Sequence, residues 1–298
     1  MSEPSVSVII PAYRAAATIG RAIDSLLAQT RTPNEIIVID DGSPDDMTAA
    51  LAPYGERVRR IRQANSGAAS ARNRGIDLAQ GELIAFLDAD DYWEPNKLQH
   101  QLAILERHPE VGLIAAHSYV QSPGQPRTPI NLPSPHLFDR VLKADGPETM
   151  MVAKRVWTST VLVRRAVLGE QRFDTTLVTA EDVDLWIRLV LSTPVYLISE
   201  PLATGVLEAG SLSRSNAAAD SRNMLAVIQR YAHVLGPRGV WAAKVLVYHE
   251  WAATHLGNGE ARKAIGPAWQ RATHQPWSAR AWWIVFKSTI WAGKTWLM

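Results

Sequence analysis

Short aliphatic runs that alternate with helical patterns constrain the fold of this chain most strongly. Three runs rich in Val, Ile and Leu occupy residues 6–10, 35–40 and 82–87. Runs of this kind are typical of strands that are buried on both faces of a sheet. Helical patterns at residues 17–29 and 66–79 separate the runs. This alternation predicts βαβ crossovers, and therefore an α/β fold with a mostly parallel central sheet flanked by helices.

Composition excludes several classes of protein. The chain has 298 residues, of which 47% are hydrophobic and 20% charged, which is typical of a packed globular protein with one large domain or one domain and an appendage. Because it has no cysteine, disulfides, thiolate metal sites and cysteine nucleophiles are excluded. No signal-peptide pattern precedes the first strand, and no apolar run is long enough to span a membrane. We therefore expect a cytoplasmic protein, either soluble or peripheral on the inner face of the cell membrane.

The net charge of +2 hides two chemically different parts. Residues 201–298 contain eleven Lys and Arg against four Asp and Glu, and they hold eight of the eleven tryptophans. We predict one domain over residues 1–215 and a basic, tryptophan-rich helical extension over residues 216–298. The helical patterns of the extension cover residues 217–235, 239–256, 259–273 and 279–296, with Gly and Pro between them.

Acidic residues follow two of the predicted strands. Asp40-Asp41-Gly42-Ser43 ends the run at 35–40, and Asp88-Ala89-Asp90-Asp91 follows the run at 82–87. In open α/β sheets, ligands bind at the carboxyl ends of the strands, so these residues are candidates for a binding site.

The two acidic clusters differ in what they predict. Asp, Gly and Ser favour tight turns, so turn formation alone explains the first cluster. The three carboxylates of the second cluster repel one another unless a cation or a donor-rich ligand neutralises them. On an extended backbone Asp88 and Asp90 point to the same side, and hard oxygen ligands suit Mg²⁺ or Mn²⁺ held jointly with substrate phosphates. The sequence therefore predicts a metal–diphosphate site at Asp88 and Asp90.

A series of motifs resembles the family 2 glycosyltransferases, which have the GT-A fold. The motifs are residues 7–13, 25–30, 35–43, 65–67, 71–75 and 86–91, followed by 158–165, 173–174 and 181–189. Their order and spacing fit the family over about residues 5–215, so a chance match is improbable. The resemblance implies a GT-A nucleotide-sugar-binding and catalytic domain over residues 1–215, with the helical extension after it.

The resemblance assigns eight residues to donor binding. They are Pro11, Tyr13, Asp40, Asp41, Asn65, Arg72, Asp88 and Ala89. Tyr13 matches a tyrosine beside the nucleotide base, although an aromatic side chain at a strand end also packs on a core. Asp41 matches the carboxylate that binds the uracil edge, which favours UDP, while GDP and dTDP donors occur in related proteins. Arg72 matches a position that lines the diphosphate.

The resemblance also implies metal ligands and a catalytic base. Asp88 and Asp90 match the family's D-x-D motif, and Asp90 is the principal metal ligand expected. Glu181 and Asp182 match the pair in which the aspartate is the base; acids in the first turn of a helix also stabilise the helix, and the two roles are compatible. Glu208 replaces a histidine of many relatives, and it is either an oxygen ligand of the metal or a loop charge.

The implied reaction is an inverting, Mn²⁺- or Mg²⁺-dependent transfer of a hexosyl or N-acetylhexosaminyl group. The donor is a nucleotide-diphosphate sugar, and the acceptor is a hydroxyl of a saccharide or lipid-linked saccharide in cell-surface polysaccharide synthesis. A catalytically inactive nucleotide-sugar-binding protein is the alternative, but the D-x-D motif and the base are both retained. A sugar nucleotidyltransferase would need a Gly-rich basic loop after the first strand, where Pro11 to Arg14 stand instead.

Two further segments carry expectations about partners. Residues 121–136 contain five prolines, which predicts a loop without regular structure, either a lid beside the acceptor or a surface crossover. In the last helix Lys287 and Lys294 share a face and accompany tryptophans. This pattern fits an interfacial membrane helix, or a helix packed on the catalytic domain or on a second subunit. We expect no nucleic-acid partner, because the charges of the extension are spread along its helices.

Overall fold

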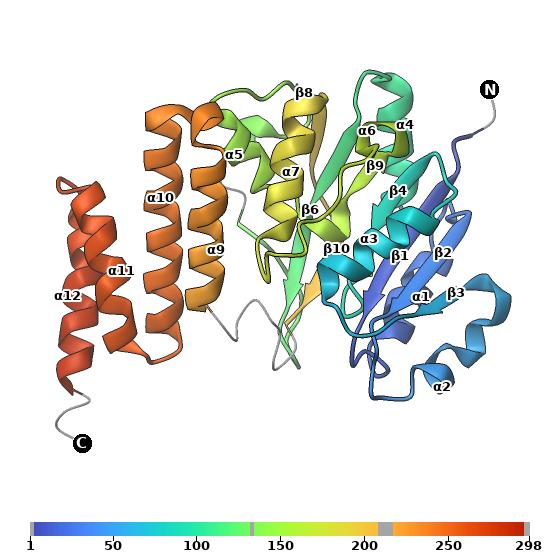
Figure 1. The fold of residues 1–298 in the computed structure, drawn as a ribbon, viewed down its shortest axis with the longest axis horizontal. Helices are drawn as coiled ribbons and strands as arrows, with labels where there is room; N and C mark the ends of the chain where they lie inside the picture. Colours follow the sequence, from blue (N-terminus) through green and yellow to red (C-terminus); the bar gives the residue numbers. More distant parts are fainter. Residues whose placement is uncertain (1–2, 132–133, 208–216, 295–298) are drawn as a thin grey trace. The chain divides into compact units, whose positions relative to one another are not determined.

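The computed structural model describes residues 3–131, 134–207 and 217–294, which form two compact units (Figure 1). The first unit contains the sheet, and the second contains the C-terminal helices. Within the described ranges, the first unit comprises residues 3–131, 134–144, 151–176 and 181–207, and the second comprises residues 145–150, 177–180 and 217–294.

The strands of the described residues join into one ten-stranded sheet in the first unit. They are β1 (Val6–Ala12), β2 (Glu35–Asp40), β3 (Arg59–Arg62), β4 (Leu83–Phe86), β5 (Tyr92–Trp93), β6 (Leu113–Gln121), β7 (Thr128–Pro129), β8 (Val141–Leu142), β9 (Leu162–Arg164) and β10 (Val195–Val206).

Helices accompany the strands of this unit. They are α1 (Ile19–Leu27), α2 (Met47–Leu51), α3 (Ala68–Leu78), α4 (Lys97–Arg107), α6 (Arg165–Leu168) and α7 (Glu181–Ser192), with short 3₁₀ turns η1 (Ala52–Arg57), η2 (Pro135–Leu137) and η3 (Thr158–Thr160). Helix α5 (Glu148–Ala153) is divided between the two units.

The strand order confirms the α/β prediction and shows where the sheet changes direction. The order is β3-β2-β1-β4-β9-β6-β10-β5, and the first four strands are all parallel, with β1 between β2 and β4. The predicted strands 6–10, 35–40 and 82–87 are β1, β2 and β4. Strand β9 lies antiparallel between β4 and β6, while β6 and β10 pair in parallel. The sheet is therefore mixed: its parallel βαβ part is the part that the sequence predicted.

The hydrophobic core has two parts, one on each face of the sheet. Val8 and Ile10 of β1 belong to a buried cluster with Ile23 of α1 and Leu98 of α4. On the opposite face, Ile9 lies against Gly75 of α3. The ring of Phe86 in β4 contacts the rings of Phe173 and Trp186, at centroid distances of 5.5 and 6.1 Å. Since successive side chains of a strand point to opposite faces, helices cover both sides of the parallel strands.

The proline-rich segment contains a short strand that the sequence did not predict. Thr128 and Pro129 form β7, which pairs antiparallel with Tyr119 and Val120 of β6. The expectation that prolines forbid any regular element at residues 121–136 was therefore wrong for these two residues, for Gln121 at the end of β6, and for Pro135 and His136 in η2. A proline is tolerated in an edge strand because its missing N–H is not needed by the ladder.

The second unit is a group of helices. They are α9 (Ala217–Arg230), α10 (Ala232–Gly257), α11 (Ala261–His274) and α12 (Ala279–Lys294). The predicted break at residues 236–237 is confirmed, because Gly236 has a φ of 64° within α10. The first predicted helix, at residues 217–235, ends earlier than expected, at Arg230. Small residues such as Ala264, Ala268 and Ala281 form the buried core of α10, α11 and α12.

Among the described helices, none has both the length and the apolar character that a membrane-crossing helix requires.

The close packing of α3 on β1 gives a test of the fold. A Cβ at Gly75 would lie 2.3 Å from the Cγ2 of Ile9. We expect Gly75→Ala to lower the free energy of unfolding by about 1–3 kcal/mol, because the strand and helix must separate to admit the methyl group. Urea unfolding monitored by circular dichroism measures this. Gly20→Ala in α1 is the control, since a Cβ there meets only the end of the Tyr54 side chain, at 3.3 Å. Equal stability of the two variants would contradict the packing.

Candidate active site

The candidate donor-binding residues meet at one edge of the parallel strands. Residues Ala12 of β1 and Asp40 of β2 are register partners, and the N–H of Asp41 donates to the carbonyl oxygen of Ala12 (2.8 Å). The acidic segment from Asp88 to Asp91 leaves the adjacent strand β4 as a tight turn, closed by a hydrogen bond from the N–H of Asp91 to the oxygen of Asp88 (3.1 Å). The two acidic clusters therefore lie at the carboxyl ends of β2 and β4, the two parallel strands on either side of β1.

A buried arginine connects this edge of the sheet to a helix that is distant in the sequence. The guanidinium of Arg72, in α3, donates from Nη2 to Oδ1 of Asp88 (2.8 Å) and from Nη1 to Oε1 of Glu181 (2.9 Å). Its Cζ also lies 5.4 Å from the ring centroid of Phe173. Glu181 is the first residue of α7, so Arg72 ties the end of β4 to the beginning of that helix. The structure thus brings together three residues that the sequence predicted separately.

Electrostatics at Arg72 and Glu181 follow from their burial and their neighbours. Burial and, to a smaller extent, the charge of the neighbouring Asp182 raise the pKa of Glu181, and Arg72 lowers it, so that the resulting pKa is about 7. Burial lowers the pKa of Arg72, but the charges of Asp88 and Glu181 outweigh that effect and raise it overall. Arg72 therefore stays cationic, while Glu181 gains and loses its proton close to neutral pH.

The hydroxyl of Ser159, in η3, holds the acidic turn in place. Its Oγ accepts a hydrogen bond from the N–H of Asp88 (3.2 Å) and donates to Oδ2 of Asp91 (2.6 Å). The other carboxylate oxygen of Asp91 accepts from the N–H of Val206 (3.2 Å). Burial, followed by the charges of Asp88 and Asp90, raises the pKa of Asp91 well above its usual range. Asp91 therefore points into the protein, and Asp88 and Asp90 are the partly exposed acids of the turn.

The segment that contains Ser159 is one of the family motifs, but its sequence predicted no role for this residue. The fully buried Ser159 also accepts, at its carbonyl oxygen, the indole N–H of Trp93 (2.6 Å). The hydroxyl of Thr158 donates to Oδ2 of Asp182 (3.4 Å). One 3₁₀ turn therefore contacts both the acidic turn and the predicted base. The signal in the sequence was a run of three hydroxyl residues, Thr158 to Thr160, before a buried strand.

Asp182 and Asp184 occupy different environments on the same helix. Asp182 is partly exposed, and its Oδ1 accepts the N–H of Val183 (2.7 Å). Asp184 is buried and forms an ion pair with Arg188 (3.0 Å), one turn along the helix. This pairing gives Asp184 a structural role. The catalytic role of Glu181 and Asp182 stays a prediction.

Asp40 serves the loop after β2. It is fully buried and accepts hydrogen bonds from Arg60 (2.6 Å), Arg62 (3.1 Å) and the N–H of Ser43 (2.9 Å). Burial raises its pKa, but the hydrogen bonds from Arg60 and Ser43 and the charge of Arg62 lower it overall. Its carboxylate is thus occupied by the protein, which is the turn-forming role that its sequence context allowed.

Asp41 orders the loop that leads into α3. Its Oδ1 accepts from Gln63 (2.9 Å) and from the N–H of Ser66 (2.9 Å), and its Oδ2 accepts from the N–H of Gly67 (2.8 Å). The exposed Asn65 lies in the same loop. Contact of Asp40, Asp41 or Asn65 with a nucleotide stays a prediction.

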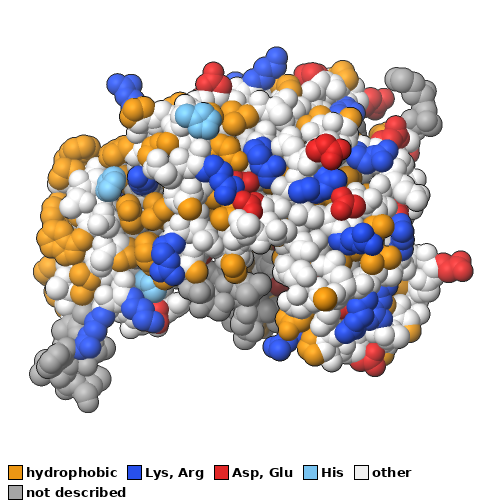
Figure 2. Space-filling model, in the orientation of Figure 1, with side chains coloured by type: hydrophobic (Ala, Val, Ile, Leu, Met, Phe, Trp, Pro, Cys, Tyr) orange, Lys and Arg blue, Asp and Glu red, His pale blue; other side chains and the backbone are white. Residues whose placement is uncertain are grey.

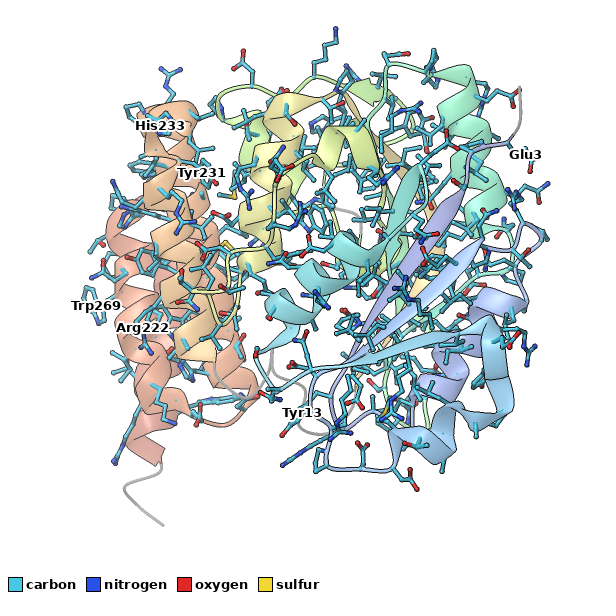
Figure 3. The ribbon with its side chains drawn as sticks, turned by 45° about the vertical axis from the view of Figure 1, so that its right-hand side comes forward. Glu3, Tyr13, Arg222, Tyr231, His233 and Trp269 are labelled. Atoms are coloured by element: carbon cyan, nitrogen blue, oxygen red, sulfur yellow. The ribbon has the colours of Figure 1, made fainter. Side chains whose placement is uncertain are left out.

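Tyr13 follows β1 and is 46% exposed (Figure 3). The guanidinium of Arg14 lies over its ring, with the Cζ 5.3 Å from the centroid. This exposure leaves the ring available for stacking and does not fit the alternative of an aromatic packed on the core. Two predicted donor-binding residues remain: Pro11 is half-buried, and Ala89 is buried.

The residues of the acidic turn fit a divalent cation that arrives with phosphates. In the described ranges, no three His, Cys, Asp or Glu side chains converge to hold a metal ion, and Glu208 lies outside the described residues. Mg²⁺ held with substrate phosphates needs only one or two carboxylates from the protein. Asp88 and Asp90 supply two partly exposed carboxylates on one tight turn.

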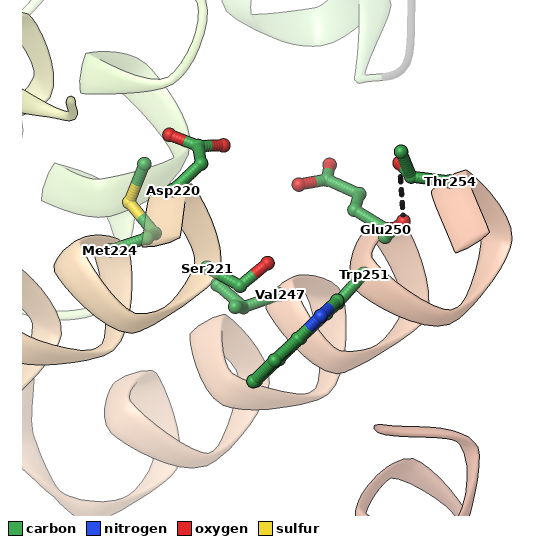
Figure 4. A pocket seen from close by; sticks show the side chains of 7 residues that line it. All are labelled: Asp220, Ser221, Met224, Val247, Glu250, Trp251 and Thr254. Atoms are coloured by element: carbon green, nitrogen blue, oxygen red, sulfur yellow. Dashed lines mark hydrogen bonds between the residues drawn. The ribbon is translucent and has the colours of Figure 1, made fainter. Parts of the chain in front are cut away.

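A cavity in the second unit is not a donor site. It lies between α9 and α10, has a volume of about 60 Å³ and includes Asp220, Glu250 and Trp251 in its lining (Figure 4). Small-molecule sites typically measure about 300–1,000 Å³, so this space is too small for a nucleotide sugar.

Comparison with known families identifies the chain. Its sequence matches the model of the family described as Glycosyl transferase family 2 over residues 7–167. The chain belongs to glycosyltransferase family 2. This family 2 glycosyltransferase is 34% identical over 219 residues to the amylovoran biosynthesis glycosyltransferase AmsB of Erwinia amylovora, covering 68% of this chain and 70% of AmsB. It is 32% identical to the putative teichuronic acid biosynthesis glycosyltransferase TuaG of Bacillus subtilis, over 63% of this chain and 73% of TuaG.

Solved structures show the same fold. The first 349 residues of S. aureus TarS in complex with UDP-GlcNAc superpose on this glycosyltransferase with a TM-score of 0.64, at 18% sequence identity, over 91% of this chain and 81% of that fragment. The complex of the same TarS fragment with UDP gives a TM-score of 0.63. The GT-A-like α/β fold with C-terminal helices is thereby confirmed.

The role of Ser159 can be tested with Ser159→Ala. The variant leaves the N–H of Asp88 and the buried carboxyl of Asp91 without their shared partner, so we expect the free energy of unfolding to fall by about 1–3 kcal/mol. Because the acidic turn loosens, release of nucleotide from the sugar donor should slow by about tenfold to a hundredfold. Thr160→Val is the control: its buried hydroxyl donates only to the carbonyl of Trp157 (2.7 Å), so stability should fall without a comparable loss of turnover. Equal turnover of the two variants would remove the role of Ser159.

Titration of Glu181 predicts a pH dependence of stability. Its pKa is about 7 in the folded protein and 4.5 when unperturbed, so the folded state holds the extra proton between these values. The contribution of the protonated Glu181 to the free energy of unfolding is complete below pH 4.5, and it is lost as the pH rises through about 7. The free energy of unfolding of the wild type minus that of Glu181→Gln should therefore fall between about pH 5 and about pH 8. Urea unfolding at several pH values measures this difference, and a constant difference would contradict the shifted pKa.

Proposed function

We propose that this family 2 glycosyltransferase transfers a sugar from a nucleotide-diphosphate sugar to a hydroxyl of a saccharide or lipid-linked saccharide, with inversion at the anomeric carbon. The acid-rich edge linked through Arg72 to Glu181 carries the proposal, because it lies at the carboxyl ends of β1, β2 and β4, where α/β sheets bind ligands. UDP is the favoured nucleotide, and the fold shared with TarS, whose structures include complexes with UDP and UDP-GlcNAc, supports that choice.

The names of the relatives support a polysaccharide product. AmsB is described as an amylovoran biosynthesis glycosyltransferase, and TuaG as a putative teichuronic acid biosynthesis glycosyltransferase. We infer that the transferred group is a hexosyl or N-acetylhexosaminyl residue and that the acceptor is a growing cell-surface polysaccharide or glycolipid.

Asp182 is the proposed base. Its carboxylate takes the proton from the acceptor hydroxyl while the hydroxyl oxygen forms a bond to the anomeric carbon, and the bond from that carbon to the diphosphate oxygen breaks. The position of Asp182 in the first turn of α7 favours the ionised form, because the helix N-terminus is partly positive. The Thr158 hydroxyl orients one carboxylate oxygen, and Glu181 remains attached to Arg72.

Donor binding is assigned to the residues around the acidic turn. The exposed ring of Tyr13 would stack on the base, and Asp41 and Asn65 would line the nucleoside. Arg72 offsets part of the negative charge of Asp88 and Glu181, which limits the repulsion between these acids and a diphosphate. Asp90 and Asp88 would hold Mn²⁺ or Mg²⁺, with Glu208 as a further candidate ligand. When bound, such a cation stabilises the charge that develops on the leaving diphosphate.

Asp182→Asn tests the base. The amide cannot accept the acceptor proton, so we expect turnover to fall by about 10²- to 10⁴-fold while the dissociation constant for the donor changes little. Nucleotide release in the presence of acceptor measures turnover, and calorimetry measures donor binding. Asp184→Asn, on the same helix, is the matched control: it weakens the ion pair with Arg188 and should lower stability but retain turnover. Wild-type turnover in Asp182→Asn would rule out this base.

Asp90→Ala tests the cation site. With Mn²⁺ present, we expect calorimetry to show UDP binding to the variant weakened by about tenfold to a hundredfold, the range seen when metal sites are disturbed. Without Mn²⁺ the variant and the wild type should bind UDP equally. Asp77→Ala is the control, since Asp77 pairs with Arg172 (2.8 Å) outside the acidic turn. Binding of UDP that is unaffected by Mn²⁺ in the wild type would remove the metal from the proposal, and binding without any turnover would favour a nucleotide-sugar-binding protein instead of an enzyme.

A further inference from the structure

Helices α11 and α12 present an exposed aromatic surface on the second unit. Hydrophobic side chains gather over these helices at the left edge of Figure 2. The exposed members, which we call the aromatic face, are Trp269, Trp282, Trp283, Phe286, Ile290 and Trp291. Trp283 is 60% exposed and Phe286 is 55% exposed, values that are unusual for side chains of this size. Soluble monomers rarely expose a contiguous apolar surface, so a surface of this kind indicates an interaction site.

The aromatic face is not needed for the packing of its own helix. Ala281, Ile284 and Val285 point inward and belong to the buried core shared with α10 and α11. Trp283 and Phe286 lie on the opposite side of α12, with Trp282 and Ile290, within an arc of about 100°. The helix is therefore apolar on two sides, and among the described residues of the second unit none covers the outer side.

Neighbouring rings make the aromatic face continuous. The rings of Trp269 and Trp282 meet edge to face, with centroids 5.3 Å apart, and those of Trp283 and Phe286 stack at 5.6 Å. Figure 3 shows Trp269 projecting outward from α11. The indole N–H of Trp282 donates to the carbonyl oxygen of Pro276 (2.8 Å), so this ring is held in its exposed position.

Charge decides what kind of partner the aromatic face suits. Residues 261–294 contain six Lys and Arg and no Asp or Glu. Arg280 and Lys287 are seven residues apart, so they lie together along one side of the aromatic arc. The ammonium group of Lys287 lies 4.5 Å from the ring centroid of Trp291. A second copy of this surface would carry the same positive charge and be repelled, whereas an anionic surface would be attracted.

We propose that the aromatic face binds the interface of a bilayer that contains anionic lipids. Tryptophan is enriched at membrane–water interfaces, where the ring enters the acyl boundary and the N–H remains near the head groups. Arg280 and Lys287 bind the anionic head groups at the edge of the same surface. The inference rests on α11 and α12 alone and does not depend on the proposed donor or on the catalytic residues.

Vesicle sedimentation with the full chain tests this binding. The probes are vesicles of phosphatidylcholine alone and vesicles in which about one third of the lipid is phosphatidylglycerol. We expect binding to the anionic vesicles, weakened by added NaCl, and little binding to the neutral ones.

Two double variants separate the apolar contribution to vesicle binding from the electrostatic one. Trp283→Ser with Phe286→Ser should weaken binding by about tenfold or more, because the variant buries less apolar surface in the bilayer. Arg280→Gln with Lys287→Gln should weaken vesicle binding by about thirtyfold, because each basic residue near an anionic surface contributes about 1 kcal/mol to binding. The matched controls are Ile130→Ser with Leu191→Ser, which change exposed apolar residues of the first unit, and Arg57→Gln with Arg107→Gln, which remove the same charge there. Both controls should bind like the wild type.

Three results would overturn the proposal. They are equal binding to neutral and anionic vesicles, no binding to either, and a loss of binding in the controls as large as in the variants. Sedimentation velocity identifies the competing explanation: a dimer that dissociates in Trp283→Ser with Phe286→Ser, without vesicle binding by the wild type, assigns the aromatic face to self-association. Circular dichroism of each variant confirms that a loss of binding is not a loss of folding.

Discussion

The buried guanidinium of Arg72 is the interaction on which the arrangement of the candidate site depends. Four further acids, Asp90, Asp91, Glu181 and Asp182, accompany Asp88 at the carboxyl edge of the sheet, and like charges at such distances repel. Arg72 donates to Asp88 and to Glu181, and its burial makes both ion pairs costly to break. The β4 end and the α7 start are held together for this reason, although 109 residues separate Arg72 from Glu181 in the sequence.

Hydrogen bonds hold the remaining acids in place, and these side chains differ in how deeply they are buried. Ser159 turns Asp91 inward and holds the backbone of Asp88, which leaves Asp88 and Asp90 partly exposed. Asp40 and Asp41 accept hydrogen bonds from their own surroundings and order the loops after β2 and before α3. The same residue type thus has two environments at this edge: buried aspartates fix the loops, and the partly exposed Asp88 and Asp90 lie on the solvent side of the acidic turn.

Local patterns allowed much of the fold to be predicted, whereas long-range contacts did not follow from them. Strands β1, β2 and β4 were found because fully buried strands have continuous aliphatic runs, and the break at Gly236 was found because glycine and proline interrupt helices. The pairing of Arg72 with Glu181 and the role of Ser159 depend on which distant segments pack together, and no local signal specifies that. The insertion of β9 antiparallel between β4 and β6 was missed for the same reason.

The central claim is that the diphosphate of a nucleotide sugar and its cation bind at the acidic turn beside Arg72. Anomalous diffraction at the manganese edge, from crystals grown with UDP and Mn²⁺, tests it most directly. We expect a manganese peak within coordination distance of a carboxylate oxygen of Asp90 and beside the phosphates of UDP. A nucleotide bound elsewhere, or a manganese ion distant from both Asp88 and Asp90, would contradict it.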